Sequence, residues 1–320
     1  MEGDFGFIGL GNMGYHMAGN IRKKMAPTTT LHVFDVVAEA CERFVKNFGQ
    51  FGPIQIARTA REVAEKSQTV ISMIPNGGNV KEVYLDPQDG VVAASKFADR
   101  LMLECSTIEV KVSQDIGHSI MDATQGLYVD TPVSGGVAGA EAGTLSFMVG
   151  FEGAHNSDPK RRRIQGILNS MGSPERITFC GKLGAGLVCK TVNNYIGLSN
   201  IVTTAQGMAF GIKHGVDKMT LYKCIKGSSG DSWVMDNAQP VPGIHAKSAS
   251  TNGFRPTFAP RLCVKDVSLA LKAAKETGIE ASMGEAALKI FKTTNDDPRT
   301  TVSFPFLYSL TRLARLSLDV

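Results

Sequence analysis

The sequence lacks the long hydrophobic segments of membrane proteins and the strong positive charge of nucleic-acid-binding proteins. No apolar run approaches the roughly 20 residues that cross a bilayer, and "MEGDFGFIGL" passes directly into a first predicted strand, which leaves no room for a signal or transit peptide. The net charge of +4 is small and scattered. We interpret the one basic cluster, 160–163, as the exposed face of a helix that begins near Pro159. We expect no membrane and no nucleic-acid partner and, for the chain as given, a cytoplasmic location.

The cysteines and histidines lack the spacing of metal ligands and redox motifs. The sequence has six of each, but no C-x-x-C pair and no H-x-x-x-H pair. The cysteines stand mostly among apolar neighbours, at positions 41, 105, 180, 189, 224 and 263. We predict reduced, buried thiols and no metal site.

The first half of the sequence alternates short apolar runs with helix-like segments, which is typical of a mainly parallel sheet covered by helices. Six runs are strand candidates: "FGFIGL", "LHVFDV", "TVISMIP", "LMLECST", "LYVDTPV" and "LSFMVG". The expected fold class is α/β, with a doubly wound sheet in the first part of the chain.

Beyond residue 181 the strand pattern gives way to segments rich in Ala, Leu, Lys and Met at helical spacing. One helix is predicted over about 185–214, largely buried because it is apolar on most of its circumference, and Gly215 would end it. We therefore predict a first domain over 1–181 and an all-α domain over 182–320, joined by this helix.

Local signals also occur within the predicted helical domain. Asp217 is a predicted N-cap, and Ser282 with Glu285 has the spacing of a capping box. Between them, "GSSGDSWVMDNAQPVPGIHAKSASTNGF" contains too much Gly, Ser and Pro for a long helix. Loops of this length in compact domains are more often functional than not.

A glycine-rich segment follows the first predicted strand. "GFIGLGNMG" has G-x-G-x-x-G spacing and opens the helix-like stretch "NMGYHMAGNI". The first glycine of such a motif permits a tight turn, the second lets backbone amides approach a pyrophosphate, and the third lets the helix pack closely on the strand. The sequence therefore predicts a dinucleotide-binding domain of the Rossmann type. Its cofactor loop comprises Gly9, Leu10, Gly11, Asn12, Met13 and Gly14.

Asp35 ends the second predicted strand, about 20 residues beyond the glycines, where such domains have an acid that binds the ribose. A carboxylate there accepts hydrogen bonds from the 2′-hydroxyl and repels a 2′-phosphate. Val36 and Val37 follow, with no arginine before Arg43, so the pattern favours NAD over NADP. The alternative is that Asp35 merely caps the following helix.

Lys190 stands in a run of glycines and apolar residues, "GKLGAGLVCKTVNNYIG". On the predicted helix it shares a face with Asn193 and Asn194, three and four residues further on. Apolar surroundings disfavour a charged ammonium and lower the pKa of a lysine, as an acid/base catalyst requires. The alternative is a lysine that extends along an apolar surface to water. The spacing alone leaves both interpretations open.

A second glycine motif follows the fifth strand candidate. In "DTPVSGGVAGAEAGTL", Ser134 precedes Gly135 and Gly136. One hydroxyl and two unhindered backbone amides suit a small anion such as a carboxylate. The alternative is an ordinary glycine turn.

These motifs, in this order, resemble those of the β-hydroxyacid dehydrogenases, over about Phe5 to Phe291. "GFIGLGNMG" is similar to the family's dinucleotide fingerprint, "PVSGGVAGAEAGTL" to its substrate motif, "GAGLVCKTVNN" to its catalytic helix and "CVKDVSLA" to its second cofactor motif. "ISMIP", "ECSTI", "SSGDSW" and "PVPG" resemble the branch that acts on 3-hydroxyisobutyrate. The resemblance implies NAD-dependent oxidation of 3-hydroxyisobutyrate to methylmalonate semialdehyde, a step of valine breakdown, by hydride transfer.

The resemblance also implies roles for single residues. Lys190 falls at the family's catalytic acid/base and Asn194 at its substrate-orienting asparagine, while the Ser134–Gly136 motif would bind the substrate carboxylate. Trp233 of "SSGDSW" would form an apolar wall for the substrate methyl group; the alternative is a core or lid tryptophan. Besides the loop at 9–14, the implied cofactor contacts are Asp35, Ile74, Pro75, Asn79, Thr107 and Lys265. For Lys265 the alternative is a surface pair with Asp266.

Two positions depart from the family pattern. His16 stands where relatives often have proline, a change that leaves the backbone donors of the loop intact. After "NDDPRTT", the segment "VSFPFLYSLTRLARLSLDV" does not match the family's charged C-terminal segment, so the family's last contacts do not carry over to about 300–320.

Several alternatives remain open. They are action on a neighbouring hydroxyacid, as by a tartronate semialdehyde reductase, reduction of a small aldehyde, and a non-catalytic NAD-binding module. The non-catalytic module is disfavoured because the chain combines Lys190, Asn194 and the Ser134–Gly136 motif. A 6-phosphogluconate dehydrogenase is disfavoured because that relative has histidine at the position of Asn193. The long apolar helix suggests a homo-oligomer, and the resemblance implies the mitochondrial matrix.

Overall fold

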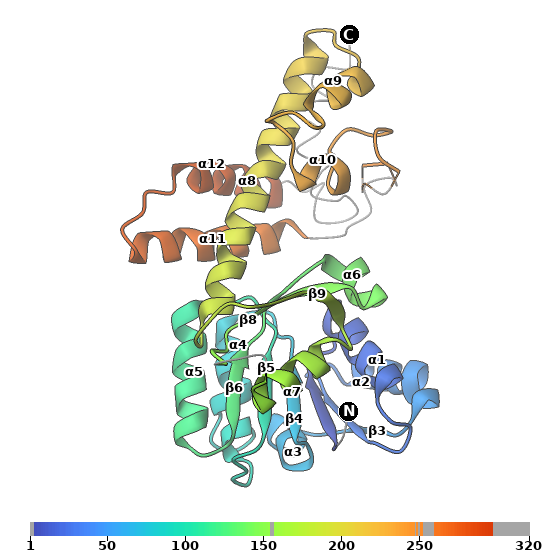
Figure 1. The fold of residues 1–320 in the computed structure, drawn as a ribbon, viewed down its shortest axis with the longest axis vertical. Helices are drawn as coiled ribbons and strands as arrows, with labels where there is room; N and C mark the ends of the chain where they lie inside the picture. Colours follow the sequence, from blue (N-terminus) through green and yellow to red (C-terminus); the bar gives the residue numbers. More distant parts are fainter. Residues whose placement is uncertain (1–2, 154–156, 247, 249, 252–258, 297–320) are drawn as a thin grey trace. The chain divides into compact units, whose positions relative to one another are not determined.

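The computed structural model describes residues 3–153, 157–246, 248, 250–251 and 259–296. The chain divides into two compact units, Met1–Lys190 and Thr191–Val320. The C-terminal segment at 300–320, which departs from the family pattern, lies outside the described residues. Figure 1 shows the elements of both units.

The first unit is built on a six-stranded parallel sheet in the order β3-β2-β1-β4-β5-β6. The strands are β1 Phe5–Ile8, β2 Leu31–Phe34, β3 Ile54–Ile56, β4 Thr69–Ser72, β5 Leu101–Glu104 and β6 Leu127–Asp130. This is the strand order of a dinucleotide-binding Rossmann fold. The α/β prediction is confirmed, although β3 was not predicted because it has three residues, mostly exposed.

Helices cover both faces of this sheet (Figure 1). One face packs against α1 Gly14–Lys24, α2 Ala38–Phe48 and α7 Pro159–Leu168, and the other against α3 Ala60–Lys66, α4 Gly77–Leu85 and α5 Val110–Asp122. Two short 3₁₀ helices, Gly49–Phe51 and Val91–Ala93, lie between these elements.

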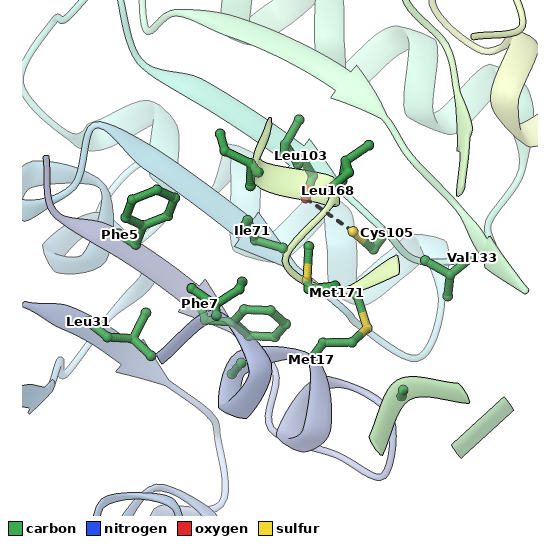
Figure 2. Packing of buried hydrophobic residues seen from close by; sticks show 14 of the residues in the cluster. Phe5, Phe7, Met17, Leu31, Ile71, Leu103, Cys105, Val133, Leu168 and Met171 are labelled. Carbon is green, nitrogen blue, oxygen red and sulfur yellow. Dashed lines mark hydrogen bonds between the residues drawn. The ribbon is translucent and has the colours of Figure 1, made fainter. Parts of the chain in front are cut away.

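Alternate strand residues contribute to the two faces. Phe5 and Phe7 of β1 belong to the cluster with α1, α2 and α7, whereas Ile8 belongs to the opposite cluster. Figure 2 shows Phe7 beside Met17 of α1 in the first cluster. Because both faces are buried, the strands read as continuous apolar runs, which is why most could be predicted.

A second, smaller sheet consists of β7 Val133–Ser134, β8 Leu145–Val149 and β9 Gly172–Phe179. The "LSFMVG" candidate is a strand, as predicted, but it belongs to this sheet and not to the main one. The "LYVDTPV" candidate divides between β6 and β7. The strand β9 was not predicted because half of the positions of "GSPERITF" are polar and it contains Gly and Pro.

The described residues of the second unit form helices and irregular segments, without strands. The helices are α8 Ala185–Lys213, which begins in the first unit, α9 Lys218–Ile225, α10 Trp233–Asn237, α11 Pro260–Glu276 and α12 Ser282–Asn295. Leu198 and Val202 of α8 pack against Val267 of α11 and Phe291 of α12. Met208 of α8 belongs to a smaller cluster with Met235 of α10 and Val241.

The predicted helix ends were right in two cases and wrong in one. Gly215 adopts a φ of +83° just after α8, and the Asp217 carboxylate accepts hydrogen bonds from the first amides of α9, as predicted. The capping box at Ser282 and Glu285 is wrong. Ala281 is the N-cap of α12, and Ser282 is already helical, one position too late for its hydroxyl to cap the helix.

The cysteine prediction needs correction. Cys189 and Cys224 are exposed and Cys180 is half-buried, so only three of the six thiols are buried as predicted. The helix α7 begins at Pro159 and exposes Lys160, Arg162 and Arg163, as predicted, and the Arg163 guanidinium also donates hydrogen bonds to the carbonyls of Asp99 and Gln68. Among the described residues, no helix is long and apolar enough to cross a membrane.

Candidate active site

The carboxyl ends of the parallel strands form one edge of the main sheet. The strand order reverses between β1 and β4, because β2 and β3 lie on one side of β1 and β4, β5 and β6 lie on the other. Such a switch point is where α/β sheets bind ligands. Three hydrogen bonds join the segments along this edge: Leu10 N to Asp35 Oδ2 at 2.6 Å, Met73 N to Ile8 O at 2.9 Å, and Ile74 N to Ser106 Oγ at 2.7 Å. The predicted cofactor segments at 9–14, 35 and 74 are therefore brought together.

The three glycines of the loop between β1 and α1 differ in their surroundings. Gly9 has a φ of +94°, and a Cβ there would lie 2.3 Å from the Met73 carbonyl oxygen. A Cβ on Gly14 would lie 1.9 Å from the Gly9 carbonyl oxygen, whereas a Cβ on Gly11 would meet nothing within 4 Å. Gly9 thus permits the turn, Gly14 the close packing, and Gly11 leaves the backbone open to a ligand.

The amino-terminal end of α1 suits an anion. Met13 is its N-cap and makes no side-chain hydrogen bond to the first amides, and Gly11 and Asn12 are exposed. Helix amides without a side-chain cap, together with the positive end of the helix dipole, attract phosphate. The loop therefore fits the pyrophosphate of a dinucleotide.

The Asp35 carboxylate accepts hydrogen bonds from Leu10 N and, at 2.8 Å, from Val37 N. The alternative that Asp35 caps the next helix is wrong, because Val37 is the N-cap of α2 and no side chain caps it. Asp35 instead joins the end of β2 to the glycine loop. The adjacent Val36 is 89% exposed, so an apolar side chain stands next to the carboxylate at the surface.

The segment after β4 carries three more predicted cofactor residues. Ile74 is buried and held by Ser106, and Pro75 is exposed beside it. Asn79 lies in the first turn of α4, where its amide N–H donates to the Oδ1 of Asn76 at 3.0 Å. Sequence reasoning missed Asn76 as the N-cap, although the N-x-x-N spacing after "IP" could have indicated it.

Thr107 follows β5 on the same edge and is half-buried. Two residues before it, Cys105 is buried and donates through its amide to the Ser72 carbonyl of β4 at 2.8 Å. The backbone that leads to Thr107 is therefore fixed by the neighbouring strand.

Ser134, Gly135 and Gly136 lie at the turn from β7 into α6 Gly136–Ala142. Gly135 and Gly136 have φ angles of +132° and +63°, which side chains rarely adopt, and both are exposed. The far end of α6 is tied to the cofactor helix α1, because the buried Asn20 amide donates to the Ala140 carbonyl at 2.6 Å. Sequence reasoning missed Asn20, because its hydrogen-bond partner lies 120 residues away in the sequence.

Lys190 lies on α8 and is 8% exposed, so its amine is not directed into bulk water. The start of α8 is held by Asp130, whose carboxylate accepts from Gly184 N at 2.7 Å and Leu187 N at 2.9 Å. Burial raises the pKa of Asp130, and the backbone amides oppose this shift. Sequence reasoning missed Asp130, which fixes the helix turn that precedes Lys190.

Two predicted site residues in the second unit interact with the same acid. Asn194 of α8 donates to the Oδ2 of the buried Asp266 at 2.9 Å. The Lys265 amine lies 3.3 Å from the Asp266 Oδ1, so the pair considered as its alternative role is present. Asn193 in turn donates to the Oδ1 of Asn194 at 3.3 Å.

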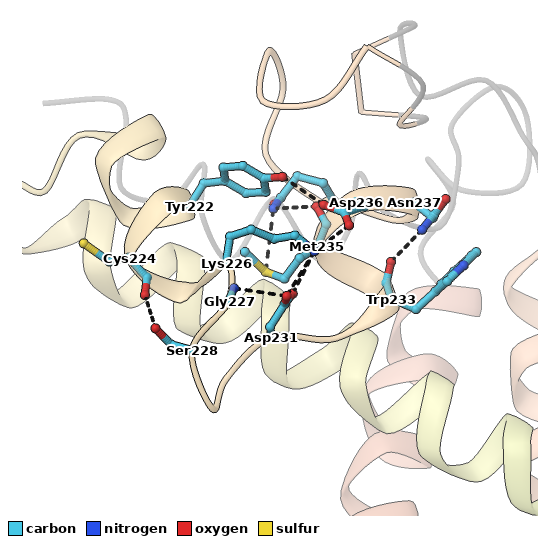
Figure 3. A network of polar contacts seen from close by, with 11 residues as sticks. Tyr222, Cys224, Lys226, Gly227, Ser228, Asp231, Trp233, Met235, Asp236 and Asn237 are labelled. Atoms are coloured by element: carbon cyan, nitrogen blue, oxygen red, sulfur yellow. Dashed lines mark hydrogen bonds and ion pairs between the residues drawn. The ribbon is translucent and has the colours of Figure 1, made fainter.

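Trp233 begins α10 and is 68% exposed, which excludes a role as a core tryptophan. Figure 3 shows the polar network of α10 and the segment before it, with Trp233 at its edge. Lys226 Nζ lies 2.6 Å from Asp236 and 3.0 Å from Asp231, and the Tyr222 hydroxyl donates to Asp236 at 2.8 Å. These ion pairs raise the pKa of Lys226 and hold the "SSGDSW" segment that carries Trp233.

Comparisons with known proteins agree with this architecture. One family model, described as the NAD binding domain of 6-phosphogluconate dehydrogenase, matches residues 4–184, and another, described as the NAD-binding of NADP-dependent 3-hydroxyisobutyrate dehydrogenase, matches residues 184–301. The mitochondrial 3-hydroxyisobutyrate dehydrogenase of Mus musculus is 35% identical over 287 residues, which cover 90% of this chain and 80% of that protein. The chain belongs to the β-hydroxyacid dehydrogenase family.

Further relatives are similar over nearly the whole chain. The 3-hydroxyisobutyrate dehydrogenase of Pseudomonas aeruginosa is 36% identical over 292 residues, which cover 90% of this chain and 91% of that protein. A structure of Mycobacterium tuberculosis 3-hydroxyisobutyrate dehydrogenase with L-serine has a TM-score of 0.83 at 30% identity and covers 98% of this chain and 99% of that one. This member of the family is an NAD(P)-dependent dehydrogenase.

Proposed function

We propose that this chain oxidises 3-hydroxyisobutyrate to methylmalonate semialdehyde, with NAD as the cofactor and Lys190 as the acid/base. The observation that carries the proposal is the burial of the Lys190 side chain in a chain that also has a complete glycine loop. An amine removed from bulk water serves as a proton acceptor near neutral pH more readily than an exposed one. The similarity to named 3-hydroxyisobutyrate dehydrogenases supports the choice of substrate.

Bound NAD supplies the chemistry of hydride acceptance, and the residues of the chain hold and deprotonate the substrate. Neutral Lys190 takes the proton of the substrate hydroxyl during oxidation, and its ammonium returns a proton to the carbonyl oxygen in reverse. Asn194 holds the substrate hydroxyl, with its own amide oriented by Asp266. Ser134 and the two glycines after it bind the carboxylate, and this positioning lowers the barrier.

Two remaining roles are proposed on different grounds. The cofactor role of Lys265 rests on the resemblance of "CVKDVSLA" to the family's second cofactor motif, and its ion pair with Asp266 would hold the amine in place. Trp233 provides an apolar wall for the substrate methyl group, because a large aromatic side chain is exposed on a segment whose backbone is held by ion pairs.

The preference for NAD over NADP rests on Asp35 and the valines beside it. A 2′-phosphate near Asp35 would meet a carboxylate and no adjacent cation, because Val36 and Val37 are apolar. Arg43, the next arginine, lies over the ring of Tyr15 with 4.8 Å between its guanidinium carbon and the ring centroid. The family model over 184–301 is described as NADP-dependent, so the preference for NAD rests on this chain's own Asp35 and Val36; Psf3, whose structure holds NADP+, is only 20% identical and shows the fold alone.

The wider setting is part of the proposal. The reaction would be a step of valine breakdown, and the mitochondrial name of the mouse relative supports a matrix location, which fractionation of the source cells tests.

The helix α8 exposes an apolar stripe, which supports a homo-oligomer. Its residues follow one another at helical spacing and are each about half exposed: Val188, Val192 and Ile196. Analytical ultracentrifugation measures the mass of the oligomer.

The substrate is tested by steady-state rates on a panel of 3-hydroxyacids, each run with NAD and with NADP. We expect the highest kcat/KM for 3-hydroxyisobutyrate with NAD. A higher kcat/KM for the tartronate semialdehyde couple would change the assigned substrate but leave the proposed mechanism unchanged. Binding of NAD without turnover of any hydroxyacid would instead support a non-catalytic module.

A further inference from the structure

A buried polar network lies directly beneath the loop at 73–75. Its centre is Glu104, the last residue of β5, which is fully buried and pairs in register with Ser72 of β4. The Ser72 hydroxyl donates to one carboxylate oxygen of Glu104, and Ser106 N donates to the other at 2.7 Å. A carboxylate at this position is therefore engaged on both of its oxygens.

The network continues on both sides of Glu104. On one side, Ser72 Oγ lies 2.7 Å from the hydroxyl of Tyr84, which is buried on α4. On the other side, Ser106 donates through its amide to Glu104 and accepts through its hydroxyl the hydrogen bond from Ile74 N at 2.7 Å. Ser106 thus connects the buried acid to the backbone of the loop.

The position of this loop matters to the glycine loop beside it. Met73 is hydrogen-bonded to Ile8 at the end of β1, and its carbonyl oxygen would lie only 2.3 Å from a Cβ on Gly9. The two segments are therefore in close contact, with no free space between their backbones at this point. A shift of Met73 and Ile74 would displace the glycine loop.

We propose that Glu104 is a positioning residue for the dinucleotide: through Ser106 it sets the backbone of Ile74 and hence the shape of the cofactor loop. The inference rests on the proposed contact between Ile74 and the cofactor. It does not depend on which hydroxyacid is the substrate, because the contacts that carry it all lie in the first unit.

The charge of Glu104 changes near neutral pH. Burial raises the pKa of Glu104 to about 7, and the hydrogen bonds from Ser72 and Ser106 oppose the shift. The ionisable groups that act on it electrostatically are Tyr84, Cys105 and Tyr128, and burial raises the pKa of each, so all three are neutral at this pH. The ionised carboxylate accepts on both oxygens, whereas the protonated acid donates from one of them, which reverses the hydrogen bond with Ser72 or removes the acceptor of the one from Ser106.

The test measures NADH binding by fluorescence titration from about pH 6 to 8, in the wild type and in Glu104→Gln. Glutamine has the shape of the protonated acid. We expect the Kd of the variant at pH 8 to be raised roughly three- to tenfold, as for one weakened buried hydrogen bond, and the two proteins to converge at pH 6. Comparing the two proteins at each pH isolates the contribution of Glu104.

Two further variants complete the test. Ser106→Ala removes the link itself and is expected to raise the Kd for NADH by a similar factor. Once the link is absent, Glu104→Gln should have no further effect, so the double variant should have the same Kd as the Ser106→Ala variant. Glu82→Gln, an exposed acid on α4, is the charge-matched control and is expected to bind NADH as the wild type does. Equal Kd values for the wild type and Glu104→Gln at pH 8, or tighter binding by the variant, would overturn the proposal. Because only binding is measured, a wrong choice of hydroxyacid leaves this result unaffected.

Discussion

The candidate residues of the first unit are held mainly by backbone geometry, whereas those of the second unit are held by pairs of side chains. At the cofactor edge, glycines allow backbones to approach closely, and Asp35 and Ser106 bind backbone amides. In the second unit, Asn194 is held by Asp266, and the segment before Trp233 by Lys226 and its two acids. Backbone contacts in a packed core tolerate change poorly, and exposed ion pairs contribute little. Substitutions should therefore have large effects in the first unit and small ones at the exposed pairs of the second.

The largest of these effects is expected at Gly14. In Gly14→Ala the new methyl group would overlap the Gly9 carbonyl, so the loop must move away from α1. We expect NADH affinity to fall roughly 100-fold or more, because several hydrogen bonds to phosphate are lost together. Fluorescence titration measures the Kd. Gly166→Ala on α7, where a Cβ meets nothing within 4 Å, is the matched control and should bind NADH as the wild type does. Wild-type NADH affinity in Gly14→Ala would contradict the close packing.

A substitution at Asp130 tests the start of α8. Asp130→Ala leaves the amides of Gly184 and Leu187 buried without a partner, and the free energy of unfolding should fall by about 2–4 kcal/mol. Urea denaturation followed by circular dichroism measures this. Asp122→Ala, at the exposed end of α5, should change stability by no more than about 0.5 kcal/mol. Equal losses in the two variants would show that Asp130 does not support the helix.

The charge of Glu104 should make stability depend on pH. The pKa of Glu104 is about 7 in the folded protein and 4.5 in an unfolded chain, so the protein binds the proton more tightly when folded and loses stability as the pH rises through 7. Glu104→Gln has no such charge. Between about pH 5 and 8 the variant should gain roughly 2–3 kcal/mol relative to the wild type in urea denaturation. Parallel stability curves for the two proteins would contradict a buried, titrating Glu104.

The smallest effect is expected at the exposed ion pairs of the second unit. Lys226→Met removes both contacts shown in Figure 3, but each is open to water and therefore screened. Differential scanning calorimetry should show a thermal midpoint within about 2 °C of the wild-type value. A much larger decrease would remove the contrast between the two units.

Features that depend on neighbours in the sequence could be predicted. The glycine spacing predicts the β1–α1 turn because each glycine answers a local requirement of the loop, and Asp217 caps α9 through amides two and three residues away. The long helix was predicted over about 185–214 and extends over Ala185–Lys213, because its composition is itself a local pattern. Its predicted burial is wrong, since Val188, Val192 and Ile196 are each about half exposed.

Features that depend on distant contacts could not be predicted. Asp130 reaches amides 54 and 57 residues away, and Asn194 reaches an acid 72 residues away. Glu104 reads in sequence as the polar end of an apolar run, and only the pairing of β4 with β5 brings it to Ser72. The capping box at Ser282 failed because two registers of α12 differ by one residue, and spacing does not distinguish them.

The central claim is that Lys190 moves the proton while the glycine loop holds the dinucleotide, and one pair of variants tests it directly. Lys190→Ala is compared with Lys213→Ala, an exposed lysine near the end of the same helix. The account predicts that kcat for 3-hydroxyisobutyrate oxidation falls by about 10³-fold in Lys190→Ala alone, with NADH affinity retained in both variants. Turnover by Lys190→Ala at a rate close to that of Lys213→Ala would contradict it.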